Sequence, residues 1–501
     1  MMDREQRRKS VQSYLDGQKS HAERNLLGQF STPYPLAVEI MNYVKRLVGH
    51  DEKVAFLEPA CGTGVFYSAL VATFEREQIE TARGYEIDAD YYSALNTIWE
   101  NEAFDIRHGD FLQQSPESSF SLIVANPPYS RHHHLTSDRK ASLKRLVYDR
   151  FGINISSLSG LYCYFLLLST SWLKEGGISC WLIPSEFLDV NYGKAVKEFL
   201  LKRVTLLSIH RFQPDDLQFS DALVSSSVVL FRNSPPQDHV ISFSTGGSLA
   251  SPQQLMTYWH HELSSNLKWS SCFRQCEGVS VYTHESETLG DYFEVKRGLV
   301  TGNNDFFLVD RKTIELYELP GECLTPMLPG PRYLAEDVVE LSTLAVHEPG
   351  IQLFSCTWPE SRIRMEYPRM WEYIQKGYNQ HVHEGYICSR RTPWYSCEYR
   401  SPAPFLVPYM SRHSQRGKLF RFILNRSNAL ATNVYLLLYP RENIVDKIQD
   451  FGKLESVWKF LNNISDDIIA RCGRVYGGGL HKLEPRELSA MPVTGFRRII
   501  S

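Results

Sequence analysis

The first half of the chain predicts an α/β fold with a mostly parallel β-sheet. Short apolar runs alternate with longer amphipathic segments over the first ~230 residues, the pattern of a layered α/β domain. A glycine turn joins the first apolar run to the helix that follows it. A polar side chain stands at the end of each of the first four runs, where open parallel sheets bind their ligands.

The elements follow in order along this half. We expect helices that begin at about residue 65 and that span residues 89–100, 158–173 and 195–201. The expected strands are residues 54–58, 82–86, 104–108, 120–125, 177–183, 206–212 and 224–231. Residues 233–254 are rich in Ser, Pro, Gly and Gln, which predicts one or two strands, at 240–243, and then a linker.

The C-terminal half differs in composition. Beyond about residue 280, short apolar runs are mixed with prolines, aromatic residues and arginines. We therefore expect two domains, residues 1–270 and residues 271–501, the second of mixed α/β type. A chain of 501 residues with 43% hydrophobic content is ample for both cores.

Charge and cysteine usage exclude several classes of protein. The net charge is −3, so any nucleic-acid surface has to be a local patch. No apolar run approaches the ~18 residues of a membrane helix, and the polar start lacks the pattern of a signal peptide. The ten cysteines are scattered and form no CxxC pair, which favours a reducing cytoplasm and argues against a zinc site.

The glycine turn indicates a cationic ligand. Residues 56–66, Phe-Leu-Glu-Pro-Ala-Cys-Gly-Thr-Gly-Val-Phe, end a strand in an acid and open a helix after a Gly-x-Gly turn. A dinucleotide fingerprint needs a third glycine where Tyr67 stands, so NAD is disfavoured. The carboxylate of Glu58 suits S-adenosylmethionine (AdoMet), which carries a sulfonium and an ammonium group.

Two further acids follow later strands. Glu86 lies ~20 residues or more after the glycine turn, where an acid can accept hydrogen bonds from both ribose hydroxyls. Asp110 could accept from the adenine amine of AdoMet, and Phe111 could stack on that adenine. These positions predict a donor site that runs across several strand ends.

The most informative stretch is Asn126-Pro127-Pro128-Tyr129, directly after the apolar strand at 120–125. Proline fixes φ and donates no backbone hydrogen bond. The loop therefore offers two acceptors, Asn126 Oδ1 and the Pro127 carbonyl, beside the flat ring of Tyr129. Such a loop suits a planar ring with an exocyclic amino group, and it predicts methyl transfer to the amine of a base.

Together with Gly28-Gln29-Phe30-Ser31-Thr32-Pro33, these motifs resemble the gamma-class DNA adenine-N6 methyltransferases of bacterial type II restriction–modification systems. The resemblance implies a class I AdoMet-dependent methyltransferase domain with a mostly parallel seven-stranded sheet. It also implies a C-terminal mixed α/β target-recognition domain. The donor contacts that it implies are Thr32, Glu58, Ala60, Gly62, Glu86, Asp110 and Phe111.

The same resemblance implies a flipped-out adenine as the methyl acceptor. Asn126 Oδ1 and the Pro127 carbonyl would accept both amine N–H groups, while Tyr129 and Pro128 would contact the base. Accepting both protons favours a pyramidal nitrogen whose lone pair points at the methyl group. Asn rather than Ser at the first position of the loop leans to adenine N6 over cytosine N4.

A flipped base also needs an aromatic face opposite Tyr129. In the family this face comes from a phenylalanine before the last strand of the sheet. Counting back from Phe231 places it at Phe219, with Phe212 as the rival. Phe212 is expected to end a strand and to pack in the core.

A basic segment at about residues 131–157 follows the catalytic loop. It begins Arg131-His132-His133-His134 and also carries Arg139, Lys140, Lys144 and Arg145. Adjacent histidines on an extended segment point to opposite sides, and no partner has ligand spacing, so we expect no metal. We expect a mobile loop that closes on DNA phosphates near the flipped base.

The C-terminal domain is expected to read double-stranded DNA. Two landmarks, residues 295–305 and 477–485, resemble those of target-recognition domains, and their glycines would let the backbone approach DNA. Trp394, Tyr395 and Tyr409 are expected in the core. Arginine can read guanine or neutralise phosphate. The basic stretch between the landmarks contains Arg390, Arg391, Arg400, Arg412, Arg416, Lys418, Arg421 and Arg426.

The sequence thus predicts a monomeric, site-specific DNA adenine methyltransferase that protects a short recognition site from a separate restriction endonuclease. The alternatives are methyl transfer to a protein glutamine or to an RNA base amine, because the loop cannot distinguish these amines. A DNA-binding module with an inactive methyltransferase fold is disfavoured, because the loop and the donor motifs are intact.

Overall fold

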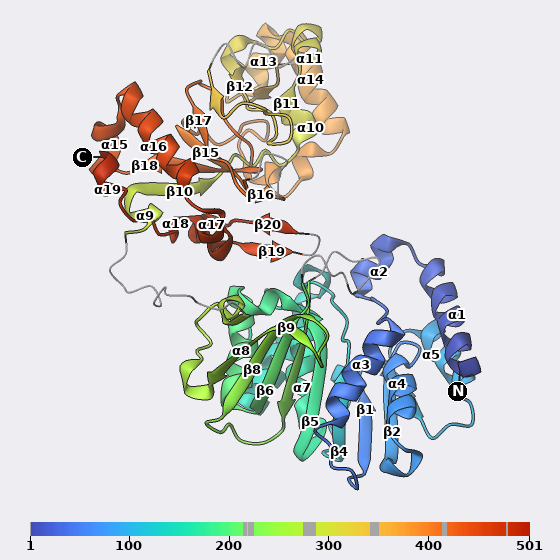
Figure 1. Cartoon of the computed structure of the whole chain (residues 1–501). Coiled ribbons are helices and arrows are strands. Elements are labelled where there is room, and N and C mark those ends of the chain that lie inside the picture. Colours follow the sequence, from blue (N-terminus) through green and yellow to red (C-terminus); the bar gives the residue numbers. More distant parts are fainter. Residues whose placement is uncertain are drawn as a thin grey trace. The chain divides into compact units, whose positions relative to one another are not determined.

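The computed structural model describes residues 2–213, 218, 225–273, 287–340, 350–412, 418–476 and 479–500 (Figure 1). The chain divides into two compact units. One comprises Met1–Gly278 with Tyr476–Gly478, and the other comprises Val279–Val475 with Gly479–Ser501. The sequence had suggested a division at residues 270–271. Within the described ranges, every helix is too short or too polar to span a membrane.

A nine-stranded sheet forms the centre of the N-terminal unit, in the order β3-β2-β1-β4-β5-β7-β6-β8-β9. Strands β1 and β4 are buried along their whole length, as expected for parallel strands covered on both faces. The strands are β1 (Val54–Glu58), β2 (Ile79–Glu86), β3 (Asp105–His108), β4 (Phe120–Ala125), β5 (Leu173–Pro184), β6 (Thr205–Arg211), β7 (Ser226–Arg232), β8 (Val240–Gly247) and β9 (Pro252–Trp259).

The first seven strands have the order and directions of a class I methyltransferase sheet. Strands β3, β2, β1, β4 and β5 pair in parallel, and β7 runs antiparallel to both β5 and β6. The predicted fold class is therefore confirmed. The sheet is longer than the predicted seven strands, because β8 and β9 form an antiparallel hairpin beside β6. The linker expected after residue 243 was wrong.

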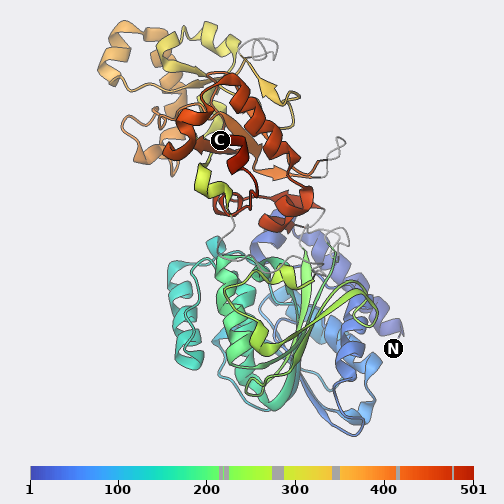
Figure 2. The ribbon, with the colours of Figure 1, turned by 60° about the vertical axis from the view of Figure 1, so that its left-hand side comes forward.

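Helices cover both faces of this sheet (Figures 1 and 2). Helices α3, α4 and α5 pack on one face, in an apolar cluster with Phe56 of β1. Helices α6, α7 and α8 pack on the other face, with Leu57 of the same strand. The helices of this unit are α1 (Met2–Gln18), α2 (His21–Leu27), α3 (Tyr34–Lys45), α4 (Val65–Thr73), α5 (Ala89–Ile98), α6 (Ser137–Phe151), α7 (Leu161–Ser169) and α8 (Lys194–Lys202).

Helix α6 replaces the basic loop that was expected at about residues 131–157. Thr136 caps its first turn by accepting a hydrogen bond from Arg139 N, and Gly152 ends it with a φ of 65°. Leu143 and Val147, four residues apart, are buried on the same side. This narrow apolar stripe could not be recognised in the sequence, because charged residues make up much of the helix.

The C-terminal unit is of mixed α/β type, as predicted. A five-stranded sheet has the order β10-β18-β15-β17-β13, and two small sheets have the orders β11-β14-β12 and β16-β20-β19. The strands are β10 (Phe293–Arg297), β11 (Leu308–Val309), β12 (Leu324–Pro326), β13 (Val338–Val339), β14 (Gln352–Phe354), β15 (Phe405–Pro408), β16 (Met410–Ser411), β17 (Ile423–Asn425), β18 (Tyr435–Pro440), β19 (Arg474–Tyr476) and β20 (Leu480–Lys482).

Short helices surround these sheets, and three apolar clusters fill the space between them. The described helices are α9 (Leu289–Tyr292), α10 (Asn304–Phe307), α11 (Arg311–Leu316), α13 (Glu360–Glu366), α14 (Pro368–Asn379), α15 (Glu442–Val445), α16 (Phe451–Asn463), α17 (Asp466–Cys472), α18 (Pro485–Ser489) and α19 (Arg497–Ile500).

Candidate active site

The carboxyl ends of the first four strands meet at one edge of the sheet. Because β3, β2, β1 and β4 are parallel neighbours, the residues that follow them lie side by side. A cavity of about 650 Å³ lies at this edge. Its lining includes Thr32, Glu58, Ala60, Gly62, Glu86, Asp110, Phe111, Asn126 and Pro128. All seven residues that were predicted to bind AdoMet, the methyl donor, are therefore brought together in one cavity.

Glu58 ends β1 inside the protein. Its side chain is buried, and Oε2 accepts a hydrogen bond from the backbone N–H of Tyr67 at 3.1 Å. Burial raises the pKa of this carboxyl well above its ordinary value. The glycine turn stays close because Gly64, at a φ of 79°, leaves no room for a Cβ beside Trp99. A cation in the cavity would restore the charged form of Glu58.

Glu86 ends β2 and is braced by the backbone. Its Oε2 accepts from Gly62 N and its Oε1 from Asp88 N, both at 2.8 Å. Burial is the largest cause of a pKa raised to about 7. The carboxyl is thus fixed in direction, and it lines the cavity beside Gly62 of the glycine turn.

Asp110 and Phe111 follow β3. Asp110 Oδ1 accepts from Leu112 N at 3.1 Å, and its Oδ2 forms an ion pair with Arg139 of α6 at 2.5 Å. Phe111 is buried in an aromatic cluster, with its ring centroid 5.0 Å from that of Trp172. Sequence reasoning had placed Arg139 on the DNA, but its guanidinium closes one wall of the cavity.

Asn126 follows β4 with its amide held in one orientation. Nδ2 donates to the Phe30 carbonyl at 2.9 Å and to Thr32 Oγ1 at 3.0 Å. Oδ1 is buried and has no hydrogen-bond partner. An unsatisfied buried acceptor is rare and costs about 1–3 kcal/mol, so this atom is prepared for a donor from outside the chain.

The other residues of the loop differ in exposure to the cavity. Pro128 lines it, whereas Pro127 and Tyr129 are not part of its lining. Tyr129 is 8% exposed, and its hydroxyl donates to the Leu182 carbonyl at 3.1 Å. Its ring lies against that of Phe30, with centroids 5.7 Å apart. The aromatic face is therefore close to the site but covered from several sides.

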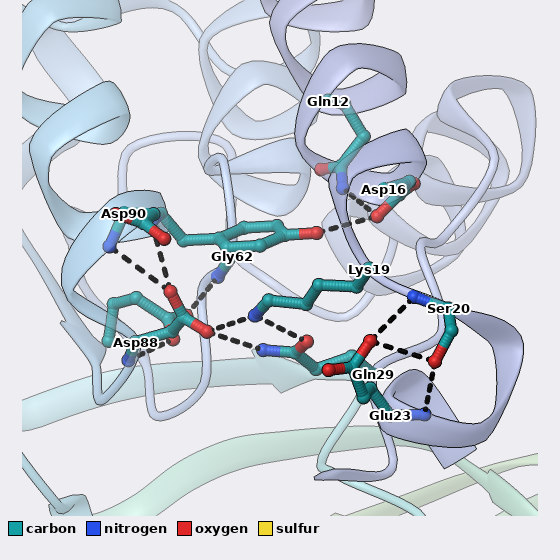
Figure 3. Close-up of polar contacts among 11 residues, drawn as sticks. Gln12, Asp16, Lys19, Ser20, Glu23, Gln29, Gly62, Asp88 and Asp90 are labelled. Carbon is teal, nitrogen blue, oxygen red and sulfur yellow. Dashed lines mark hydrogen bonds and ion pairs between the residues drawn. The ribbon is translucent and has the colours of Figure 1, made fainter. Parts of the chain in front are cut away.

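The N-terminal helices contribute lining residues that sequence reasoning missed, namely Gln12 of α1 and Leu26 and Leu27 of α2. Polar contacts hold this segment against the sheet edge. Lys19 forms an ion pair with Asp88 and donates to Gln29 Oε1 at 3.0 Å (Figure 3). Asp16 of α1 accepts from the Tyr91 hydroxyl at 2.6 Å. The available signal was the Ser20-x-x-Glu23 capping box of α2, whose reciprocal hydrogen bonds are seen in Figure 3.

Several other predicted features lie elsewhere. Phe219 lies outside the described residues. Phe212 is 2% exposed and belongs to the apolar cluster of α3–α5, as expected for a core residue. The three histidines form a short 3-10 turn, and no group of three His, Cys, Asp or Glu suited to a metal ion occurs among the residues that the structure describes.

Most of the predicted arginine cluster stabilises the C-terminal unit. Arg391 donates to the carbonyls of Val300 and Thr301 at 2.8 and 2.7 Å. Arg421 forms an ion pair with Asp337 at 2.7 Å and donates to several backbone carbonyls. These guanidinium groups already donate to partners within the unit, so few of their N–H groups are left to bind DNA.

Three described members of this basic stretch, Arg390, Arg412 and Lys418, are exposed. Arg390 is exposed and stacks on the exposed ring of Tyr386, 3.6 Å from its centroid. Arg412 is exposed as well, and Arg416 lies outside the described residues. The core positions predicted for Trp394, Tyr395 and Tyr409 are confirmed, with exposed fractions of 8%, 0% and 5%.

Comparison with known proteins agrees with this architecture. A family model described as Eco57I restriction-modification methylase matches residues 50–218. A second, described as the C-terminal domain of Type II methyltransferase M.Eco57I, matches residues 267–500. The two models therefore divide between the N-terminal sheet and the C-terminal unit.

Similar proteins span nearly the whole chain. Type II methyltransferase M.AccI of Acinetobacter calcoaceticus is 26% identical over 93% of this chain and 85% of its own length. Type II methyltransferase M.XamI of Xanthomonas campestris pv. amaranthicola is 25% identical over 94% of this chain and 86% of its own length.

Among solved structures, the Type IIL restriction-modification enzyme MmeI in complex with DNA has a TM-score of 0.55. Its sequence identity is 11%, over 87% of this chain and 67% of that one, so the likeness concerns the fold. Both parts of the chain match one methylase, and relatives of the same kind align along its whole length. Over both of its units, the chain is therefore similar to the Eco57I restriction-modification methylase family.

Proposed function

We propose that the chain is a site-specific DNA methyltransferase that moves a methyl group from AdoMet to N6 of a flipped-out adenine. The modified sequence would be protected from a cognate restriction endonuclease. The observation that carries this proposal is the buried, unpartnered Oδ1 of Asn126 at the end of β4. The named relatives are type II methyltransferases, which supports DNA as the substrate.

The cavity fits the donor in size, charge and hydrogen-bonding capacity. A volume of about 650 Å³ accommodates a nucleoside joined to an amino acid. Two buried carboxyls with raised pKa values, Glu58 and Glu86, would meet a ligand that carries two positive charges. We assign Glu58 with Thr32 to the amino acid end, Glu86 to the ribose, and Asp110 with Phe111 to the adenine. The backbone at Ala60 and Gly62 would lie along the donor.

The loop after β4 would activate the adenine amine. Asn126 Oδ1 and the Pro127 carbonyl accept its two N–H groups, which favours a pyramidal nitrogen with a directed lone pair. When bound, AdoMet supplies an electrophilic methyl group on a sulfonium. The N6–CH3 bond would form as the S–CH3 bond of AdoMet breaks, S-adenosylhomocysteine would be the leaving group, and the surplus proton of the amine would pass to solvent. No covalent intermediate with the protein is required.

Positioning is the rest of the mechanism. We propose that Tyr129 stacks on one face of the flipped base and that Phe219 stacks on the opposite face. Pro128 would also contact the base. Duplex DNA would be held by the C-terminal unit acting as a target-recognition domain, with Arg390 as a surface contact. The assignment of Arg391 to DNA is weakened by its two hydrogen bonds to the loop at residues 300–301.

The experiment that tests this proposal uses a host that lacks DNA methylation. The full chain is expressed there, and modified bases in the host genome are mapped by long-read sequencing. N6-methyladenine at one short repeated sequence is expected, and it should be absent with Asn126→Ala. Methylated cytosine at such a site would overturn the choice of base.

The amine acceptors other than DNA are not favoured. A protein glutamine or an RNA base as the methyl acceptor would explain the loop. It would not explain why residues 267–500 match the C-terminal domain of a type II methyltransferase. If tritium from labelled AdoMet entered protein or RNA and not DNA, these alternatives would replace the proposal.

A further inference from the structure

In the C-terminal unit, two cationic side chains lie over the ring of the buried residue Tyr409. They come from opposite ends of the sequence of this unit. The guanidinium of Arg297 lies 4.0 Å from the ring centroid of Tyr409, and Lys482 Nζ lies 5.1 Å from the same centroid. Arg297 belongs to the first predicted landmark and Lys482 to the second. The fold therefore joins the two landmarks at a single aromatic ring.

The ring is fixed by its surroundings. Tyr409 N donates to the Val434 carbonyl at 2.8 Å, and the Tyr409 carbonyl accepts from Leu483 N at 3.1 Å. Its hydroxyl donates to Glu484 Oε1 at 2.7 Å. The side chain is 5% exposed, so it forms a rigid support rather than a surface group.

Gly298 explains how Arg297 reaches this support. A Cβ at Gly298 would lie 2.0 Å from the Thr432 carbonyl oxygen, so only glycine lets β10 end this close to the neighbouring chain. Gly298 N donates to the Tyr435 carbonyl at 2.9 Å. This glycine therefore serves packing within the unit, instead of the approach to DNA expected from the sequence.

The two cations differ in how much of their charge is compensated. Lys482 forms an ion pair with Glu484 at 2.9 Å. Arg297 is exposed, makes no ion pair within the described residues, and donates only a long hydrogen bond, from Nε to the Asn433 carbonyl at 3.4 Å. Its terminal N–H groups thus face solvent while stacking holds the plane of the guanidinium.

We propose that the Arg297 guanidinium, stacked on Tyr409, binds a backbone phosphate of duplex DNA. This inference rests on the proposed function and adds a contact that the arginine-rich stretch did not supply. A planar guanidinium whose terminal Nη1 and Nη2 edge is free can donate to two phosphate oxygens in a bidentate way. Because the group is exposed, a single small anion would stay hydrated, whereas a polyanion gains free energy from counterion release.

The test measures binding of the full chain to two labelled duplexes at about 50 to 200 mM salt. One duplex contains the mapped recognition site and the other does not. Arg297→Ala should weaken binding to both by the same factor. It should lower the slope of log affinity against log salt by about 0.9, so that the deficit shrinks about 3.5-fold across this range.

The matched control is Lys296→Ala, which removes one positive charge from the neighbouring position of the same strand. Adjacent strand residues point to opposite faces, and Lys296 pairs with Glu294 at 2.9 Å. Its salt slope should stay at the wild-type value. Arg297→Lys should restore the slope but not the full affinity, because ammonium lacks the planar fork. A thermal unfolding curve that matches the wild type verifies that the C-terminal unit of each variant is folded.

The outcomes separate this inference from the proposed function. An unchanged slope with Arg297→Ala, in a wild-type protein that binds and methylates DNA, would overturn the phosphate contact alone. Loss of discrimination between the two duplexes would show base reading and would also overturn it. A wild-type chain that binds AdoMet but no duplex DNA would overturn both.

Discussion

Asn126 Nδ2 donates a 3.0 Å hydrogen bond to Thr32 Oγ1, and the two residues are 94 positions apart. The same nitrogen donates to the Phe30 carbonyl at 2.9 Å. Two acceptors beside one end of the carboxamide identify that end as the nitrogen, because a flipped amide would oppose two oxygens. The segment before α3 thus decides where Oδ1, the acceptor that we propose to be catalytic, points.

Thr32→Val tests this relationship. Valine keeps the shape of the side chain but cannot accept the hydrogen bond. The free energy that holds the Asn126 amide in its orientation therefore falls by about 1 kcal/mol. We expect kcat to fall about five- to tenfold. The Kd for AdoMet should also rise, because Thr32 is assigned to the amino acid end of the donor as well. Thr32→Ser, which retains the hydroxyl, should keep most of the activity. A weaker donor affinity with normal kcat would mean that Thr32 acts on the donor alone and does not orient Asn126.

Asn126→Ala removes the acceptor itself. Methyl transfer should drop by about 100-fold or more, because a preorganised hydrogen-bonding group at the reacting centre is lost. AdoMet binding, measured by calorimetry, should remain. Asn96→Ala is the matched control, since Asn96 is an exposed residue of α5 that bonds only the carbonyl one turn back. Normal turnover in Asn126→Ala would exclude the proposed role.

The donor side of the site was predictable from local patterns. Glu58, Glu86, Asp110 and Asn126 each follow an apolar run, and parallel strand ends must meet at one edge. That rule needs no knowledge of distant contacts. It is why the cavity contains every predicted donor residue.

Features that depend on long-range contacts could not be read in this way. Arg139 appeared to be one charge in a basic loop, yet a helix turns it toward Asp110. Arg391 appeared to be a DNA contact, yet its partners are carbonyls 90 and 91 positions away. Nothing in the local sequence distinguishes a guanidinium that binds backbone from one that binds phosphate.

Arg391→Ala should therefore reduce stability more than it reduces DNA affinity. Two carbonyls, of Val300 and Thr301, lose charge-assisted donors, which costs about 1–3 kcal/mol in total. Thermal unfolding of the variant should shift downward. Arg390→Ala removes the same side chain from an exposed neighbour and should leave the melting temperature within error. Equal melting temperatures for the two variants would refute a structural role for Arg391.

Donor binding should release protons. In the folded protein without donor, burial raises the pKa of Glu86 from its ordinary 4.5 to about 7 and raises that of Glu58 as well. The folded state thus holds an extra proton on Glu86 between pH 4.5 and 7, and its stability falls as pH rises through that window. Above it, the buried charge costs about 3 kcal/mol. Bound AdoMet would place its positive groups near Glu58 and its ribose hydroxyls against Glu86, which favours the charged carboxylates and lowers both pKa values.

Calorimetry of AdoMet binding in buffers of different ionisation enthalpy measures this release. At pH 6, where Glu86 is mostly protonated, the observed binding enthalpy should vary with the buffer. The part of this variation that comes from protons released by Glu86 should diminish above pH 8. Glu86→Gln should remove that part and weaken the donor, because one acceptor becomes an amide. Glu77→Gln, at an exposed position, should change neither. A binding enthalpy independent of buffer at pH 6 would mean that the donor does not favour the charged form of these carboxyls, and the assignment of the cavity to AdoMet would lose this support.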